Sequence, residues 1–377
     1  MTARAAGLCV LIALAASLTP VPVPALTARE GQAARAAASL PARLSDAEFW
    51  KLVGDISEPG GYFRITDNYT SNEIEVGRLF TMLRERNVRG GVYMGVGPEQ
   101  NFTYMAAVRP AMAFIVDIRR QAVMQHLMFK AVFELSKDRA EFISLLFSRP
   151  RPASVDAKGS IQRIWEAYFA IPADPALAVK NRTRIVDHLT RTHRFTLTES
   201  EAAQLDSVIA AFVTYGPGIT TRGSFSGRGG GNNVTFADLT GWSLDASGQP
   251  QSFLSSDEHY QIVKALHDRN LIVPVSGDFG GAKAIRAIGD YVRARKATVS
   301  AFYVSNVEQY LFQDGKQHTF YENVGTLPLA DTSVFIRPYS LRRGWGTVQS
   351  LCAIPGFLKS AAAGRVYSNN DALACVQ

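Results

Sequence analysis

Cysteine is scarce in this chain of 377 residues, which has three in all. Cys9 lies in an apolar N-terminal run, and Cys352 and Cys375 lie close together near the C-terminus. In an oxidising compartment these two would form a disulfide that holds the C-terminal segment in place. The alternative is a pair of unpaired small core residues. Neither interpretation supplies a catalytic thiol or a zinc site.

Histidine pairs spaced to bind a metal from one helical face are missing too. His188 and His193 are five apart, and His259 and His267 are eight apart. Two ligands on one face of an α-helix need the spacing i and i+4, so the sequence predicts no metal site. The serine-hydrolase pattern is also absent, because phenylalanine stands at the centre of the glycine-bounded segment 223–227.

No stripe of basic residues interleaved with aromatics is visible. The net charge of +7 comes from 40 Lys and Arg against 33 Asp and Glu, and the basic residues are dispersed along the chain. This distribution is typical of an ordinary solvated surface with mild attraction to anionic ligands. We therefore expect a small-molecule ligand and no nucleic-acid partner.

The apolar run at the N-terminus is short for a membrane span. Fourteen residues, 5–18, follow Arg4, whereas a span needs about 20. Small residues up to Ala25 fit a signal-peptidase site, so 1–25 is predicted to be a signal peptide, with an uncleaved anchor as the alternative. The leader favours export to the periplasm or exterior of a bacterium, with no stable membrane span after cleavage.

Regular alternation of strand and helix patterns occupies both halves of the mature chain. It predicts an α/β fold, a Rossmann-like open and mostly parallel sheet flanked by helices, with a helical insertion. Predicted strands are 92–96, 112–117, 271–275, 298–304 and 334–336, with a short one at 62–65. The predicted divisions are a linker (26–44), the first half of the Rossmann-like domain (45–136), the helical insertion (137–215), a Gly-rich loop or lid (216–256) and the second half with the C-terminal tail (257–377).

A glycine turn between two apolar runs is the strongest local motif. Gly95 and Gly97 end the first predicted strand, and Asp117 ends the second, 20 residues beyond Gly97. Glycines there permit close backbone approach to a ligand, and the acidic residue is placed to bind ribose hydroxyls. Glu99 near the following helix start would repel a pyrophosphate, which argues against NAD or FAD and favours a cationic or zwitterionic ligand.

Other polar residues fall at strand ends or lead into the core. Asp278 is interpreted as a general base or ligand contact, or as a helix N-cap; Asn306 and Glu308 as a hydrogen-bonding pair of the site, or as a helix start. A capping box of Thr70 with Glu73 would leave other polar neighbours for the ligand. The remaining candidates are Asp67, Asn68, Asn72, Asn101 and Ser305.

These motifs resemble class I S-adenosylmethionine-dependent methyltransferases, and more closely an uncharacterised bacterial family with that sheet. The resemblance covers residues 67–120 best and 271–312 less well. It implies that S-adenosylmethionine lies against Gly95 and Gly97, with Asp117 on its ribose. The acidic residue usual before the glycines is absent, and so is an Asn- or Asp-Pro-Pro-aromatic methyl-transfer motif.

Two functions follow as expectations. The first is an exported methyltransferase, or a degenerate relative that keeps the fold. The second is a non-catalytic periplasmic protein that binds a small ligand or acts in envelope interactions, because S-adenosylmethionine is scarce outside the cytoplasm and fold does not fix function.

Overall fold

The computed structural model describes residues 39–73, 76–223, 234–340 and 347–375. The predicted signal peptide (1–25), most of the linker and residues 224–233 of the Gly-rich segment lie outside the described residues. Their predicted roles stay predictions.

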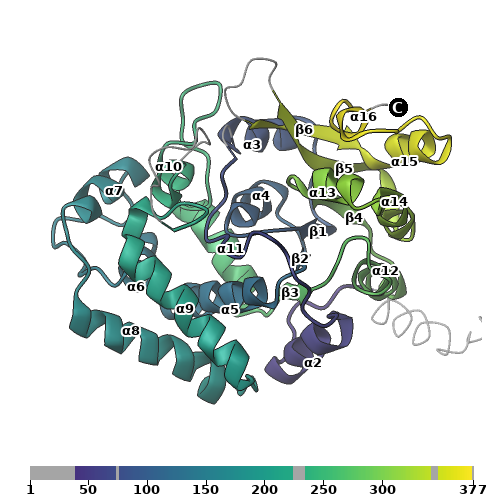
Figure 1. Cartoon of the computed structure of the whole chain (residues 1–377). Helices are drawn as coiled ribbons and strands as arrows, with labels where there is room; N and C mark the ends of the chain where they lie inside the picture. The colour runs from purple at the N-terminus through teal and green to yellow at the C-terminus, as the bar shows by residue number, and fades with distance from the viewer. Residues whose placement is uncertain (1–38, 74–75, 224–233, 341–346, 376–377) are drawn as a thin grey trace, which may run out of the picture. The chain divides into compact units, whose positions relative to one another are not determined.

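One six-stranded sheet organises the described chain, with the strand order β3-β2-β1-β4-β5-β6 (Figure 1). Strands β1 to β5 are parallel, and β6 runs antiparallel to β5. The predicted Rossmann-like α/β fold is thereby confirmed. The strands are β1 (Val92–Gly95), β2 (Met112–Asp117), β3 (Ile272–Ser276), β4 (Val299–Tyr303), β5 (Leu329–Ser340) and β6 (Thr347–Ala353).

Apolar runs form the inner strands because helices cover both faces of the sheet. Every residue of β1, β2 and β3 is buried, as expected for parallel strands between two helical layers. Pro274 is tolerated in β3 because this strand forms an edge of the sheet. The surrounding helices are α2 (Asp46–Ile56), α3 (Val76–Glu85), α4 (Gln100–Val108), α5 (Arg120–Leu135), α11 (Asp257–Asp268), α12 (Ala284–Ala294), α13 (Val307–Gln313), α14 (Gln317–Gly325), α15 (Ile354–Ala362) and α16 (Asn369–Leu373).

Helices between β2 and β3 form a layer on the left of Figure 1. Helices α6 to α9 lie in the region predicted as a helical insertion (137–215), whereas η2 and α10 lie in the segment predicted as a Gly-rich loop or lid (216–256). Buried aromatic side chains join it to the sheet domain, and Phe212 contacts both Phe129 of α5 and Phe147 of α6. The helices are α6 (Arg139–Phe147), α7 (Ile161–Phe169), α8 (Pro175–Asp187), the π-helical turn η1 (His188–Thr192), α9 (Glu199–Tyr215), the short 3₁₀ turn η2 (Gly216–Gly218) and α10 (Phe236–Gly241).

Residues 57–73 form neither helix nor strand, so the short strand predicted at 62–65 is wrong. The segment crosses the carboxyl edge of the sheet, where Gly61 N–H donates to the Ile118 carbonyl and Glu58 N–H to the Ser276 carbonyl. These single hydrogen bonds, rather than regular strand pairing, hold the irregular segment over the ends of the strands.

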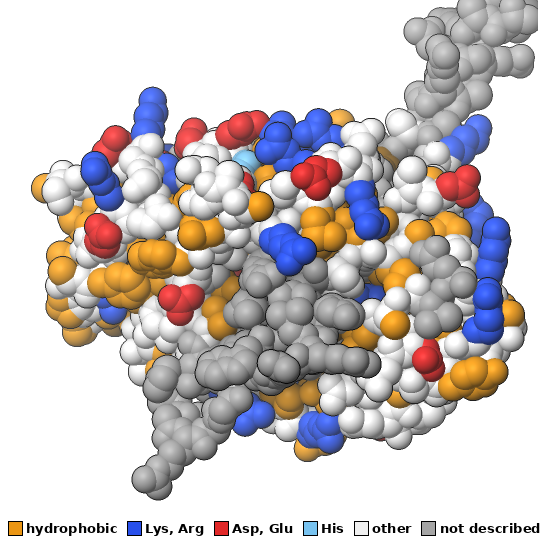
Figure 2. All heavy atoms as spheres, turned by 90° about the horizontal axis from the view of Figure 1, so that it is seen from above, with side chains coloured by type: hydrophobic (Ala, Val, Ile, Leu, Met, Phe, Trp, Pro, Cys, Tyr) orange, Lys and Arg blue, Asp and Glu red, His pale blue; other side chains and the backbone are white. Residues whose placement is uncertain are grey.

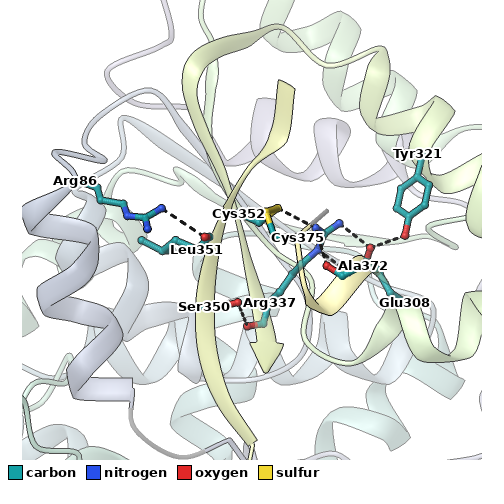
Figure 3. The surroundings of a disulfide bond; sticks show 9 residues. All are labelled: Arg86, Glu308, Tyr321, Arg337, Ser350, Leu351, Cys352, Ala372 and Cys375. Carbon is teal, nitrogen blue, oxygen red and sulfur yellow. Dashed lines mark hydrogen bonds and ion pairs between the residues drawn. A yellow bond between two sulfur atoms is a disulfide. The ribbon is translucent and has the colours of Figure 1, made fainter. Parts of the chain in front are cut away.

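The predicted disulfide between Cys352 and Cys375 is present and joins β6 to the chain end after α16 (Figure 3). Among the described residues, no helix combines the length and apolar character that a membrane crossing requires. On the face shown in Figure 2, basic side chains lie scattered among acidic and apolar ones.

Candidate functional site

A cavity of about 250 Å³ opens at the carboxyl edge of the sheet. It lies where the strand order reverses, because β2 and β3 lie on one side of β1 whereas β4 and β5 lie on the other. Open α/β sheets bind ligands at this position. The walls come from residues 62–72, the turn after β1, the tips of β2, β3 and β4, and helix α13.

The cavity brings together seven of the twelve residues that the sequence singled out for a ligand site: Asn68, Asn72, Gly97, Asp117, Asp278, Ser305 and Asn306. Five others do not line it: Asp67, Gly95, Glu99, Asn101 and Glu308.

Gly95 and Asn101 determine the shape of the turn from beneath. Asn101 Nδ2 donates to the carbonyls of Val96 (3.0 Å), Gly97 (3.2 Å) and Pro98 (2.7 Å). A Cβ atom on Gly95 would lie 1.9 Å from Asn101 Oδ1, so only glycine leaves room for this side chain. The two residues therefore support the cavity wall rather than forming it.

Gly97 itself forms the wall, with a φ of +75° that favours glycine. Its carbonyl accepts a hydrogen bond from His126 Nε2 at 2.9 Å. Burial lowers the pKa of His126, so this ring is a neutral donor that holds the turn from below.

Glu99 is buried beneath the segment that follows Asn68, away from the cavity. Its Oε1 accepts from the Thr70 hydroxyl and from Ser71 N–H at 3.3 Å. Burial raises the pKa of Glu99 to about 7, so the carboxyl is mostly protonated at pH values below 7. Thr70 thus contacts Glu99, which differs from the capping box expected with Glu73.

Asp117 lies at the tip of β2 and is held by Arg119. Its Oδ1 accepts from Arg119 N–H and Nε, both at 3.0 Å, and its Oδ2 accepts from Arg119 NH2 at 2.9 Å. Burial acts to lower the pKa of Arg119, but the Asp117 charge outweighs it and the pKa is raised. Asp117 and Arg119 therefore line the cavity as an ion pair.

Asp278 forms a second charged pair at the tip of β3. Lys316 Nζ donates to its Oδ2 at 2.8 Å, and Gly280 N–H donates to its Oδ1 at 2.9 Å. The N-terminus of α12 is instead capped by Glu58, whose Oε1 accepts from Lys283 N–H (3.0 Å) and Ala284 N–H (2.9 Å). Asp278 shapes the loop before that helix and leaves the capping to Glu58.

Ser305 and Asn306 follow β4 at the cavity. Ser305 Oγ donates to Glu73 Oε1, and the Tyr303 hydroxyl donates to Glu73 Oε2, both at 2.7 Å. Burial, with the Glu73 charge, raises the pKa of Tyr303 far above its ordinary value. Asn306 is exposed, lines the cavity and makes no side-chain cap to α13.

Glu308 turns away from the cavity into a buried ion pair. Its Oε2 accepts from Arg337 Nε at 2.7 Å, and its Oε1 accepts from Arg337 NH2 (2.8 Å) and from the Tyr321 hydroxyl (2.9 Å), as Figure 3 shows. Arg337 is fully buried, so this carboxylate compensates its charge.

Asp67 likewise stays outside the cavity lining. Its Oδ1 accepts from the Tyr69 hydroxyl at 3.2 Å. Burial, together with the Asp67 charge, raises the pKa of Tyr69 to about 12.

Sequence reasoning missed the aromatic part of the wall. Phe63 and Tyr310 meet edge to face with ring centroids 4.8 Å apart, and both line the cavity together with Tyr62. Arg64 lies 4.7 Å over the Tyr310 ring. Aromatic residues following the pair Gly60-Gly61 in a polar segment were the signal that could have indicated them.

The arrangement can bind a small molecule that carries both charges. Two ion pairs and Asp314 supply charge of both signs, and the aromatic side chains supply flat apolar surface. Among the described residues that line the cavity there is neither histidine nor cysteine.

Comparison with known proteins identifies the family and leaves the activity open. No curated protein matches the chain. One family model matches residues 69–168 and 240–356, more than half of the chain, and these ranges include β1 to β4, the Gly97 turn, Asp117 and Asp278. The gap between them holds α8, η1 and α9. The chain therefore belongs to the family described as a domain of unknown function (DUF7790).

Proposed function

We propose that this chain is a methyltransferase-like protein whose cavity binds S-adenosylmethionine or a closely related zwitterionic nucleoside. The observation that carries the proposal is the position of Gly97 and Asp117 on one cavity at the reversal of strand order. In this type of sheet a backbone turn after the first strand and an acidic tip on the second face the same ligand.

The charges of the walls favour a zwitterion over a polyanion. Asp117 and Asp278 are each paired with one cation, and Asp314 adds a further carboxylate. A ligand with an amino and a carboxylate group would find a partner for each, and its base would lie against Phe63 or Tyr310.

A binding role without turnover is the second candidate, favoured by the Arg119 contact. Both Asp117 oxygens already accept from Arg119, so ribose hydroxyls would share an occupied carboxylate. The missing methyl-transfer motif points the same way. An envelope-interaction role that needs no ligand is less favoured, because the described residues leave the cavity open.

Calorimetric titration with S-adenosylmethionine and S-adenosylhomocysteine tests the proposal. We expect saturable binding that Asp117→Ala reduces at least tenfold and that Asp331→Ala, at an exposed position by the opposite edge of the sheet, leaves unchanged. Flat traces with both ligands contradict the proposal. The protein is then incubated with S-adenosylmethionine and an envelope extract that supplies methyl acceptors. Release of S-adenosylhomocysteine favours the enzyme, and binding without release favours the binding protein.

We also propose export, which the disulfide supports because such bonds persist in oxidising compartments. Fractionation of cells that express the tagged full chain should place it outside the cytoplasm. A variant lacking residues 2–25 should stay in the cytoplasm with Cys352 and Cys375 reduced. If the full chain and the variant lacking residues 2–25 were found in the same cell fraction, export would be contradicted.

A further inference from the structure

Three potential metal ligands meet at the opposite edge of the sheet from the cavity. Glu134, His188 and His193 bring one ligand atom each to within 4.8 Å of one another. Glu134 lies in the last turn of α5, which begins after the carboxyl end of β2 and returns to the amino edge. In Figure 1, α2 and α8 lie low in the view with α5 above them. The cluster is therefore separate from the ligand cavity.

A π-helical turn explains why the histidine spacing looked wrong for a metal. His188 and His193 frame the turn η1, and His193 N–H donates to the His188 carbonyl at 3.0 Å. A π-turn repeats at i and i+5, so two residues five apart come to the same face, as residues four apart do in an α-helix. Single π-turns of this kind occur frequently at functional sites.

The ligand atoms point at one another. Glu134 Oε2 lies 2.8 Å from His188 Nε2 and 2.6 Å from His193 Nε2, and the two Nε2 atoms are 3.2 Å apart. Ligands of a tetrahedral Zn²⁺ ion at about 2.0–2.1 Å from the metal are spaced about 3.3 Å. The shortest of these distances, between Glu134 Oε2 and His193 Nε2, would have to lengthen by about 0.7 Å to hold such an ion.

Outer contacts orient these groups as they do around bound metals. His193 Nδ1 lies 2.8 Å from Asp46 Oδ1, and Lys130 Nζ donates to Glu134 Oε1 at 2.5 Å. When Nδ1–H donates to Asp46, the neutral ring turns the Nε2 lone pair toward Glu134 Oε2, which is also an acceptor. Two acceptors that face each other need either a proton on His193 or a metal ion bound to both. At 2.6 Å they are spaced for the proton, and a metal ion would replace that proton as the two atoms move apart.

The surroundings exclude most water. The three side chains are 9%, 18% and 10% exposed for Glu134, His188 and His193. Phe195 stacks on the His193 ring at 5.0 Å and contacts Phe49 of α2. An apolar surround of this kind strengthens metal–ligand attraction.

We propose that Glu134, His188 and His193 bind one divalent transition-metal ion of the Zn²⁺ type, with Asp46 orienting His193 and water in the fourth position. Two imidazoles and a carboxylate are ligands that suit Zn²⁺. The ligands come from α5 and from the turn after α8, and Asp46 begins α2. The ion would thus link the inserted helices to the sheet domain.

Titration of the chelator-treated, purified protein with Zn²⁺ tests the site. We expect one ion per chain, with ligand-field absorption when Co²⁺ replaces Zn²⁺. His188→Ala, His193→Ala and Glu134→Gln should each weaken binding at least tenfold, and Asp46→Asn should weaken it about tenfold. His318→Ala, which removes an exposed histidine elsewhere, should bind as the parent does.

The parent protein alone can overturn the proposal, even if a ligand variant fails to fold. Zn²⁺ should raise its unfolding temperature, because an ion bound to the folded state stabilises that state. A folded parent that binds no Zn²⁺ identifies the cluster as a protonated His193 between two carboxylates. Binding that His188→Ala and His193→Ala leave intact places the ion elsewhere. Either outcome refutes the site.

Discussion

Glu99 shows at the scale of one residue how a group that sequence interprets as a ligand contact can instead support the cavity. Its side chain is buried, and Oε2 has no hydrogen-bond partner among the described residues. Thr70 and Ser71 donate to Oε1, which joins the turn after β1 to the irregular segment above it. A proton on Oε2 removes the charge that burial disfavours.

Glu99→Gln should therefore change how stability depends on pH. Burial raises the Glu99 pKa from 4.5 to about 7 in the folded protein. Between these values the unfolded chain releases a proton that the folded chain retains, so folded-state stability falls as pH rises. The variant lacks this loss, so its stability relative to the parent should improve by up to about 3 kcal/mol between pH 4.5 and pH 8.

Urea unfolding of both proteins across this pH range measures the effect. Glu199→Gln serves as the control, because Glu199 is an exposed carboxylate in the first turn of α9. Parallel stability curves for the parent and Glu99→Gln would show that Glu99 is ionised at pH 5 in the folded chain.

Helix α12 shows at the scale of one element how a distant carboxylate caps a helix. Glu58 comes from the irregular segment after α2, yet it accepts from Lys283 and Ala284 N–H and, through Oε2, from Asp278 N–H at 3.0 Å. It thereby satisfies free N–H groups at the helix start and places a negative charge at the positive end of the helix dipole.

Glu58→Ala should destabilise the protein by about 1–2 kcal/mol, the usual cost of losing a helix N-cap. It should also weaken ligand binding, because the loop it holds carries Asp278 into the cavity. Denaturant unfolding and calorimetry measure the two effects. Glu85→Ala, an exposed glutamate at the end of α3, is the matched control, and equal stability of the two variants would rule out the cap.

Sequence predicted the central elements well because their signals are local. Strands β1 to β4 are largely apolar, every one of their residues except Ser300 is buried, and each strand is bounded by glycine, proline or polar residues. Strand β6 escaped prediction because Thr347–Ala353 mixes polar and apolar residues, as an antiparallel edge strand does. The pairing with β5 that makes it a strand is not local.

The site was predictable where fold alone places residues, at the tips of parallel strands. Gly97, Asp117 and Asp278 were found in this way. Glu308 was wrongly predicted to line the cavity, because the sequence does not reveal its ion pair with Arg337. This partner lies 29 residues away, on a strand whose register the sequence does not give. The π-turn at His188 was missed for a related reason, since an α-helical repeat was assumed for that segment.

At the scale of the whole chain, the C-terminal residues close the sheet through one buried network. Arg337 of β5 pairs with Glu308 and also donates to Cys352 Sγ (3.2 Å) and to the Ala372 carbonyl (3.3 Å), as Figure 3 shows. The disulfide joins Cys352 to Cys375 across 23 residues. Helix α16 therefore covers the buried Arg337, which donates to a carbonyl of this helix. The disulfide just beyond α16 holds the helix in this position.

Loss of the disulfide should lower the free energy of unfolding by about 3 kcal/mol, the chain-entropy value for a loop of this length. The variant Cys352→Ala/Cys375→Ala and the reduced parent should unfold at similar guanidinium concentrations, both lower than for the oxidised parent. Adding reductant should shift the parent and leave the double variant unchanged. A parent that unfolds at the same concentration with and without reductant would mean that Arg337 and the packing of α16 hold the C-terminus without the covalent bond.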